Sequence, residues 1–469
     1  MPLHLLSPLN QVYRNLAMLV SANSCEWIVL DGPLDLDRLR AAAVATVQRH
    51  PVLNSVQVLR FPFYAWKELD TPVEVDIRHE LLGPAPDDAA LHAKLVANIH
   101  GEALPITRSR PWRLHVTEHP DGRTWLQIIT THVFTDGRSA NVVTRDLGAA
   151  YSALASGRTL PARPPASVER DPFRLFTARL TLAQRWRLGW RGLAAIVRDA
   201  TARCTALVLP DRPRGDTRVR LHDYGGTAWH ALHQGARGAG LSVHPLIIAA
   251  VLRVMQSLNA RVGHASPVIR LIDNFSLRRF AEPAGSVADL YDVFAVPYTI
   301  DFEMDDDTRA LVLQVRRKLD DLKAGGILTE LYRNWHYRNA ALLSDKKLGT
   351  RLVLRHVMRS NVICTNIGPV PEEFTHFGPR TVLDYYSFSQ MFPPGRLMFL
   401  FSTWRGHLRL VLLHDGNTIP DELAREIGEV LLPQALAQVV ERLRDPPSGT
   451  ASKVPDALTR RHHEAAPTA

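Results

Sequence analysis

The chain has 469 residues, of which 46% are hydrophobic and 22% charged, and its formal net charge is +9. A chain of this length can bury a large core, and we expect it to form two lobes. The three cysteines are odd in number and far apart, which supports neither a disulfide framework nor a zinc site and favours a reducing compartment. No apolar run approaches the roughly 20 residues of a membrane span, and the first residues lack a secretory signal, so the sequence predicts a cytoplasmic protein.

The positive charge predicts an anionic partner. Nucleic acid is disfavoured, because the sequence has no zinc-finger spacing, no ribonucleoprotein aromatic motif and no Gly-x-x-Gly clamp. Acyl-CoA, an acidic carrier protein or an anionic lipid surface would each explain the same charge. The alternative is an arginine-rich composition without a specific partner.

The first predicted elements are a strand, a helix and a second strand. The strands are expected at residues 26–30 and 55–60. Between them, Asp35 begins a helix whose apolar residues recur on one face, and Pro51 ends it. We expect His50, at the end of this helix, to cap and pack rather than to catalyse.

A second run of elements completes the first lobe, which we expect to end near residue 158. It contains a strand, a helix, two strands joined by a Pro-Asp-Gly turn, and a final helix, at residues 72–79, 87–104, 112–117, 124–131 and 138–155. The loop between the last strand and the last helix carries His132, Asp136 and Gly137.

His132 is the first candidate for a catalytic residue. A loop that leaves a buried strand and enters an amphipathic helix can present a side chain to a cleft. Neutral imidazole is the natural general base near pH 7, since its unperturbed pKa is roughly 6.5. On the local pattern alone, the alternative is a core histidine bonded to a backbone carbonyl and followed by an Asp-Gly turn.

The middle of the chain is strongly basic. Residues 157–172 are rich in Pro, Arg and Ser and predict a linker. Residues 174–203 hold seven arginines and one acid, Asp199, with Trp186 and Trp190 at helical spacing. Such a helix can lie on a membrane or bind an acidic protein. The alternative is a surface helix whose tryptophans pack against their own protein.

The second lobe is expected from residue 224 to residue 444. Its predicted helices and strands lie at residues 242–257, 267–272, 305–325, 361–371, 384–390, 397–404, 407–414 and 421–444. The last two strands form a hairpin about Arg405 and Gly406. The tail from Asp445 is rich in Pro, Ser and Ala, and we expect it to be disordered.

The segment from Thr131 to Gly137 resembles the His-His-x-x-x-Asp-Gly signature of the condensation-domain and acyltransferase superfamily. Nonribosomal peptide condensation domains, polyketide-associated acyltransferases, wax-ester synthases and plant BAHD acyltransferases belong to it. The resemblance implies an α/β fold of two chloramphenicol-acetyltransferase-like lobes that form a V, with the active-site channel between them. We therefore expect a first lobe, a linker with the basic helix, a second lobe and a tail at residues 1–158, 159–223, 224–444 and 445–469.

The resemblance also implies roles for the residues of the motif. His132 would be the general base, at the floor of the channel and open to both of its faces. Asp136 would hold the loop through an ion pair with Arg278, with Arg279 as the second choice. Gly137 would leave room at a tight turn.

Several further residues are candidates by the same resemblance. The first His of the signature is Thr131 here, which disfavours a typical peptide condensation domain. Asn366 is expected to bond the backbone, with a position facing the substrate as the alternative. The candidates for contact with the substrate are Thr131, Asn366, Tyr386, Ser387 and Ser389. No metal or cofactor is implied.

The implied activity is the transfer of an acyl chain from a thioester to an alcohol, which forms an ester in secondary-metabolite or complex-lipid biosynthesis. The donor would be acyl-CoA or a chain on a phosphopantetheinyl carrier protein. One alternative is a free-standing condensation enzyme that forms an amide on a peptidyl carrier protein. Another is a catalytically silent binding protein with the same fold. The expected partners are the carrier protein or acyl-CoA, a small alcohol or amine, and a membrane as a peripheral contact, but no nucleic acid.

Overall fold

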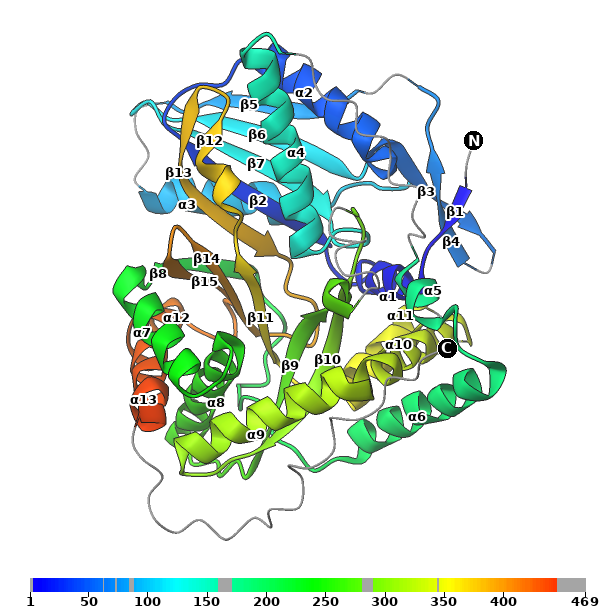
Figure 1. The fold of residues 1–469 in the computed structure, drawn as a ribbon, viewed down its shortest axis with the longest axis vertical. Helices are drawn as coiled ribbons and strands as arrows, with labels where there is room; N and C mark the ends of the chain where they lie inside the picture. The colour runs from blue at the N-terminus through cyan, green and yellow to red at the C-terminus, as the bar shows by residue number, and fades with distance from the viewer. Residues whose placement is uncertain are drawn as a thin grey trace, which may run out of the picture.

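The computed structural model describes residues 3–61, 63–71, 74–83, 88–158, 171–280, 290–343 and 346–444. Within these residues the chain forms two α/β lobes, one above the other in Figure 1. Each lobe is built on a six-stranded sheet. A third sheet joins β1 (Leu3–Leu5), β3 (Ser55–Arg60) and β4 (Phe63–Glu68). Residues 159–170 of the linker expected at 157–172, and the tail from Asp445, lie outside the described residues.

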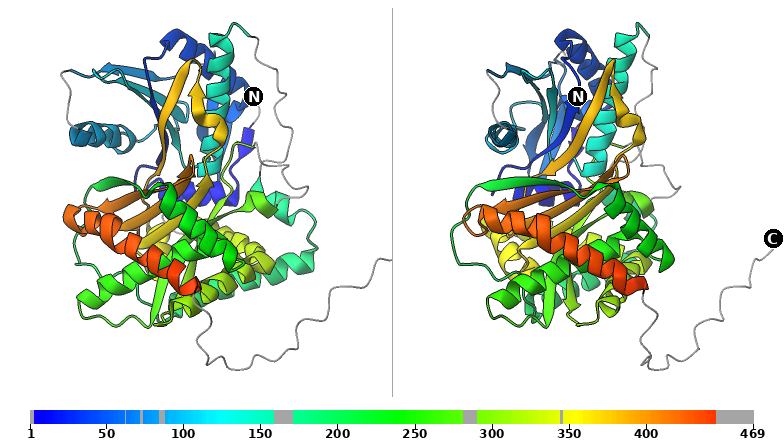
Figure 2. Two further views of the ribbon diagram at one scale, coloured as in Figure 1. Left: turned by 60° about the vertical axis from the view of Figure 1, so that its left-hand side comes forward. Right: turned by 90° about the vertical axis from the view of Figure 1, so that its left-hand side faces the viewer.

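The sheet of the first lobe has the strand order β12-β13-β2-β7-β6-β5. Its strands are β2 (Asn23–Leu30), β5 (Ile77–Leu81), β6 (Trp112–Glu118), β7 (Thr124–Thr131), β12 (His376–Phe377) and β13 (Arg380–Ser389). Helices α2 (Leu36–Arg49) and α4 (Gly137–Ala155) cover one face, and α3 (Asp88–His100) covers the other (Figure 2). Because both faces are covered, β2 and β7 are buried along their whole length.

Local chemistry explains the turns and helix ends of this lobe. Asp35 accepts a hydrogen bond of 2.9 Å from the backbone N–H of Arg38, which caps α2. Gly122 has a φ of 90° in the turn from β6 to β7, a conformation that favours glycine. His50 follows the last turn of α2, and its Nε2 lies 2.9 Å from the Asp146 carboxylate. His50 therefore has a structural role, as expected.

The sheet of the second lobe has the order β10-β9-β11-β14-β15-β8. Its strands are β8 (Thr217–Asp223), β9 (Val268–Ser276), β10 (Ala295–Glu303), β11 (Val362–Pro369), β14 (Leu397–Trp404) and β15 (His407–Asp415). The expected hairpin is present, and Arg405 and Gly406 at its turn both have positive φ.

The helices associated with this lobe are α7 (Gly225–Gly238), α8 (Val243–Arg261), α9 (Thr308–Asp321), α10 (Ile327–Leu343), α11 (Lys346–Val353), α12 (Asp421–Glu426) and α13 (Leu432–Arg444). Among the described helices, α8 is the one long and apolar enough to cross a membrane. It is mostly buried in the fold, with 67% of its most apolar stretch inside. Helix α1 (Pro8–Leu16), near the start of the chain, packs against α10.

Two strands join sheets that their positions in the sequence do not indicate. β13 pairs antiparallel with β2 and places Ser387 opposite Glu26, so it belongs to the sheet of the first lobe and not to a second lobe at residues 224–444. β8 pairs with β15, so it belongs to the second lobe rather than to the linker. Alternation along a strand shows which residues share a face, but not which sheet the strand joins.

The basic segment forms two helices rather than one. α5 (Pro172–Thr177) and α6 (Leu182–Thr201) are separated by a turn, and Thr181 and Gln184 form a capping box at the start of α6. α6 packs against α10, at the lower right of Figure 1. Trp186 and Trp190 are each 63% exposed, so the alternative in which these side chains pack against their own protein is wrong.

Candidate active site

The end of β7 holds His132 in a fixed orientation. Its backbone N–H donates to the Ala22 carbonyl at 2.6 Å, which extends the pairing of β7 with β2 by one residue. The imidazole stacks on the ring of Tyr13, with centroids 4.5 Å apart and planes at 10°, and meets the Phe392 ring edge-on at 5.8 Å. Packing on both sides therefore limits the rotamers of this histidine.

The imidazole of His132 is suited to accept a proton. Burial lowers its pKa below the usual value, and the nearby Asp136 carboxylate offsets only part of this effect. The ring is therefore neutral at pH 7. Its Nδ1 is buried and has no hydrogen-bond partner among the described residues. The ring lines a pocket described below, in which a substrate can approach it.

Asp136 joins the two lobes at the motif. It is 3% exposed and caps α4 by accepting the Ser139 N–H at 2.8 Å. Its other oxygen accepts the Phe294 N–H from the second lobe at 2.7 Å. The expected ion pair is present, with 3.6 Å between Arg278 Nη2 and the Asp136 carboxylate. Since these groups account for both oxygens, the geometry favours a positioning role for Asp136.

Gly137 lets the first turn of α4 approach β11 of the second lobe closely. A Cβ on Gly137 would lie 2.6 Å from Cγ2 of Ile367, closer than side-chain carbons approach one another. The requirement is one of space rather than of backbone conformation, because Gly137 has no positive φ.

Two pockets meet at the motif. We call the first the His132 pocket, which is mainly apolar and is lined by His132, Tyr13, Glu26, Phe392 and Met398 among others. We call the second the basic pocket, which is lined by Arg138, Arg145, Arg278 and Lys323 among others. Both are lined by Asp136, Gly137, Asn274, Ala295, Thr365 and Ile367. His132 lines the first pocket and not the second, so the expectation that it opens to both faces is not met.

Comparisons with known sequences match only part of the chain. No protein-family model matches it. A segment of 136 residues is 31% identical to a probable non-canonical nonribosomal peptide synthetase, CymA, of Salinispora arenicola, and covers 29% of this chain and 2% of that protein. A segment of 140 residues is 35% identical to phenyloxazoline synthase MbtB of a Mycobacterium species, and covers 29% of this chain and 11% of that protein. The matched segments are thus small parts of large synthetases.

Solved structures match nearly the whole chain. The first condensation domain of the calcium-dependent antibiotic synthetase has a TM-score of 0.72 at 17% identity, over 94% of this chain and 97% of that one. The starter condensation domain of rhizomide synthetase RzmA, in complex with C8-CoA, has a TM-score of 0.68 at 13% identity, over 93% and 95%. The SgcC5 protein of Streptomyces globisporus has a TM-score of 0.66 at 17% identity, over 93% and 99%.

The chain has the condensation-domain fold. The predicted resemblance and the predicted two-lobe architecture of chloramphenicol-acetyltransferase type are confirmed. The fold and the matched synthetase segments support condensation or acyl-transfer chemistry, and hence a transferase.

The residues predicted to contact the substrate lie in different places: some line the His132 pocket, one lines the basic pocket, and others line neither. Ser387 and Ser389 of β13 line the His132 pocket. Asn366 lines the basic pocket, and its side-chain oxygen accepts the Gly368 N–H at 2.9 Å, so it both faces a pocket and bonds the backbone. Thr131 is 3% exposed and is part of neither lining.

Tyr386 points away from the His132 pocket. It alternates with its neighbours Ser387 and Tyr385 along β13 and therefore lies on the other face of the sheet. Its ring contacts Trp27, and the Arg409 guanidinium lies 4.9 Å from the ring centroid. Burial raises its pKa to about 12. The prediction that Tyr386 offers its hydroxyl to a substrate in the pocket is not supported by this geometry.

Glu26 is a pocket residue that the sequence analysis missed. It lies on β2, is 2% exposed, and accepts hydrogen bonds from the hydroxyls of Tyr385 and Ser387 on β13. Burial raises its pKa to about 8, against hydrogen bonds that lower it. The carboxyl is therefore largely protonated at pH 7. The sequence signal that could have identified Glu26 is its position as the one acidic residue of a buried strand.

Glu26 should make the stability of the protein depend on pH. Its pKa is about 8 in the folded protein against an ordinary 4.5, so the unfolded chain releases this proton first as pH rises. The contribution of Glu26 to the free energy of unfolding therefore falls from about pH 4.5 to about pH 8 and is constant above. We expect Glu26→Gln to reduce the fall in Tm between these limits.

Calorimetry at about pH 5.5, inside this range, and at about pH 8.5, above it, would measure the fall in Tm for each protein. The exposed Glu422→Gln variant is the matched control and should keep the wild-type difference. An identical difference in all three proteins would show that Glu26 ionises as easily in the folded chain as in the unfolded one.

Proposed function

We propose that this protein transfers an acyl chain from a thioester to an alcohol, with His132 as the general base. The observation that carries the proposal is the neutral, oriented imidazole of His132, which lines a mainly apolar pocket. That pocket meets a second, basic pocket at Asp136 and Gly137. Two substrates can thus enter through separate pockets that share Asp136 and Gly137 of the motif.

The charge of the basic pocket supports a phosphate-bearing donor. Arg138, Arg145, Arg278 and Lys323 line it, and cations at this density attract the phosphates of CoA or of a phosphopantetheinyl arm. The starter condensation domain of rhizomide synthetase was solved with C8-CoA, and SgcC5 with a naphthyl ethanediol. An acyl thioester and a hydroxyl compound are therefore ligands of proteins with this fold.

In the proposed reaction the acyl group passes from the thiol to the acceptor without a covalent bond to the protein. The acceptor hydroxyl attacks the thioester carbonyl while its proton passes to His132 Nε2, and the new C–O bond forms. The tetrahedral intermediate then collapses, the C–S bond breaks, and the sulfur leaves as a thiol after taking the proton back from His132. The chain supplies the base and its orientation, and the proposal requires no metal or cofactor.

Amide formation on a peptidyl carrier protein is the second candidate. The similarity to segments of peptide synthetases favours it, and carrier proteins are accordingly proposed as partners of either reaction. We place both reactions in the cytoplasm. An amine and a hydroxyl can use the same base, so the two products must be separated by experiment.

The test combines two measurements. Thiol release from acyl-CoA or an acyl carrier protein is followed with a panel of alcohols and amines, and mass spectrometry identifies the product. Acceptor-dependent thiol release with an ester product supports the proposal, and an amide product supports the second candidate. The absence of thiol release, with either donor and with every acceptor, would leave only the silent binding protein.

A further inference from the structure

Helix α6 exposes five large apolar side chains on a side other than its buried face. The side chains of Leu188, Ala195 and Asp199, together with Gly192, form the buried face. The large exposed residues are Leu182 (73%), Trp186 (63%), Trp190 (63%), Leu193 (38%) and Val197 (55%). At 100° per residue, the second group lies about 120° to 200° around the helix from Leu188. We call this second group the outer stripe.

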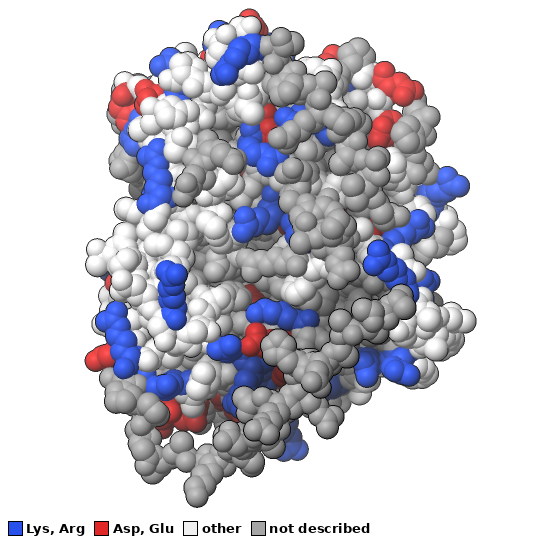
Figure 3. Space-filling model, viewed as in Figure 1, with Lys and Arg blue, Asp and Glu red and all other residues white. Residues whose placement is uncertain are grey.

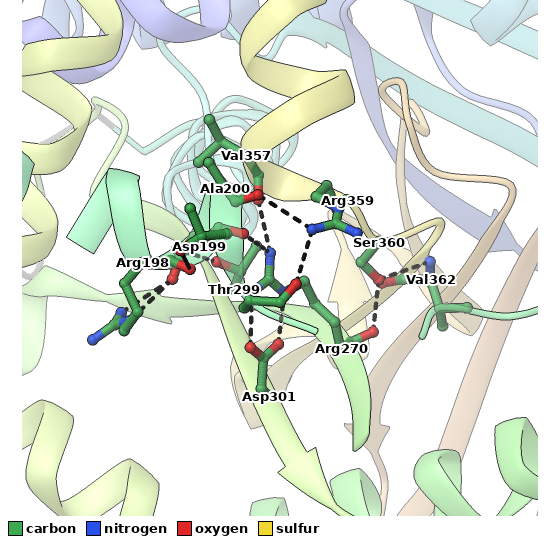
Figure 4. A network of polar contacts seen from close by, with 12 residues as sticks. Arg198, Asp199, Ala200, Arg270, Thr299, Asp301, Val357, Arg359, Ser360 and Val362 are labelled. Atoms are coloured by element: carbon green, nitrogen blue, oxygen red, sulfur yellow. Dashed lines mark hydrogen bonds and ion pairs between the residues drawn. The ribbon is translucent and has the colours of Figure 1, made fainter. Parts of the chain in front are cut away.

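The inner face of α6 is fixed firmly to the second lobe. The Asp199 carboxylate accepts Arg333 Nη1 at 2.6 Å and the Thr299 hydroxyl at 2.8 Å, and its carbonyl accepts Arg270 Nη1 at 2.8 Å. Figure 4 shows this network with the bidentate pair of Arg270 and Asp301. The outer stripe is therefore held in place, and it is not the exposed side of a loosely attached helix.

The same buried network removes the one negative charge of the segment from the surface. Asp199 is 3% exposed, and it is the sole acid among residues 174–203. Arg187, Arg191 and Arg198 lie on one flank of the outer stripe, about 100° to 140° around the helix from its centre. Figure 3 shows basic side chains beside uncharged ones at the lower right, where α6 lies in Figure 1.

An aromatic hollow adjoins the outer stripe. Trp186, Trp190 and Leu193 of α6 line it together with Phe173 of α5 and with Tyr332 and Trp335 of α10. α10 also sends Asn334 and Tyr337 to the lining of the His132 pocket. One helix thus forms part of the wall of both the surface hollow and the substrate pocket.

We propose that α6 lies in the interface of an anionic membrane, with the outer stripe inserted among the lipid chains. Tryptophan favours the boundary between headgroups and chains, since its ring is apolar and its N–H is polar. Arginines beside such a stripe bind anionic headgroups. An acidic protein would match the arginines, but it would not account for the exposure of the large apolar residues of the outer stripe, of which Leu182 and Val197 lie outside or at the edge of the aromatic hollow.

The experiment is vesicle co-sedimentation with the full chain. Vesicles of phosphatidylcholine alone are compared with vesicles that contain about 30% phosphatidylglycerol. The first variant is Trp186→Ala with Trp190→Ala, and the second is Arg187→Glu with Arg191→Glu. Arg185 is left unchanged, because its guanidinium donates to the carbonyls of Leu180 and Thr177.

The matched control carries the same charge change on other exposed helices, as Arg237→Glu with Arg317→Glu. We expect the wild type and the control to bind the anionic vesicles, and each α6 variant to bind about tenfold more weakly. Equal Tm values would establish that the variants are folded. Wild type that ignores anionic vesicles, or α6 variants that bind as well as the control, would overturn the proposal. α6-dependent binding to an acidic carrier protein without vesicle binding would do the same. None of these results depends on acyl transfer.

Discussion

We expect His132→Ala to lower kcat for acceptor-dependent thiol release by about 10²-fold or more. The variant loses the base that takes the proton of the acceptor during attack. The loss of stability should be small, because the imidazole makes ring contacts with Tyr13 and Phe392 and its Nδ1 has no hydrogen-bond partner among the described residues. Steady-state kinetics of thiol release measure the change in kcat, and a thermal melt measures the change in stability.

A second buried histidine provides the control for this result. His50 bonds the Asp146 carboxylate and lines neither pocket as described. His50→Ala should therefore lower Tm while leaving kcat near the wild-type value, which is the opposite pattern. If His132→Ala keeps near-normal turnover, substrate positioning or another base drives the chemistry.

Asp136→Ala should lower the free energy of unfolding and activity together. The change leaves the N–H groups of Ser139 and Phe294 without their acceptor. It also removes the carboxylate that lies 3.6 Å from the partly buried Arg278 guanidinium, which keeps its bonds to the Leu290 and Asp292 carbonyls. Removing one member of a buried ion pair costs roughly 3–5 kcal/mol, because the other charge stays buried. Denaturant unfolding would measure this loss, and kcat would show how far the His132 loop moves.

The ion-pair part of this effect can be separated with a double-mutant cycle. In the background of Arg278→Ala, the further change Asp136→Ala should cost less than it does in the wild type. A variant Asp136→Ala that melts like the wild type but has lost its activity would assign Asp136 to the chemistry. The positioning role would then be wrong.

Local sequence signals predicted the motif and its surroundings well. The strand, turn and strand that lead to His132 were legible because a buried run, a Pro-Asp-Gly turn and a second buried run follow one another. Arg405 and Gly406, which lie between two apolar runs, predicted the turn of a hairpin in the same way. These features depend on neighbours in the chain, so sequence order carries the information.

Features that depend on residues far apart in the chain could not be predicted from the sequence. The outer stripe of α6 has the periodicity of a packed helix, and only the buried charge network at Asp199 reveals which side faces the protein. Tyr386 and Ser387 were both predicted to face the substrate, although neighbouring residues of a strand lie on opposite faces. Only the pairing of β13 with β2 shows that Ser387 is the one beside Glu26 and the pocket. Glu26 was overlooked, since its environment comes from β13, far along the chain.

The position of β13 has a consequence for synthesis of the protein. β2 emerges from the ribosome long before β13, its neighbour in the sheet, because the paired residues Trp27 and Tyr386 are 386 − 27 = 359 positions apart. At roughly 5–20 residues per second, the edge of β2 waits tens of seconds for its partner. An unpaired apolar strand edge is a site for aggregation during that interval. The nascent first lobe is therefore a natural client for chaperones until nearly the whole chain has been made.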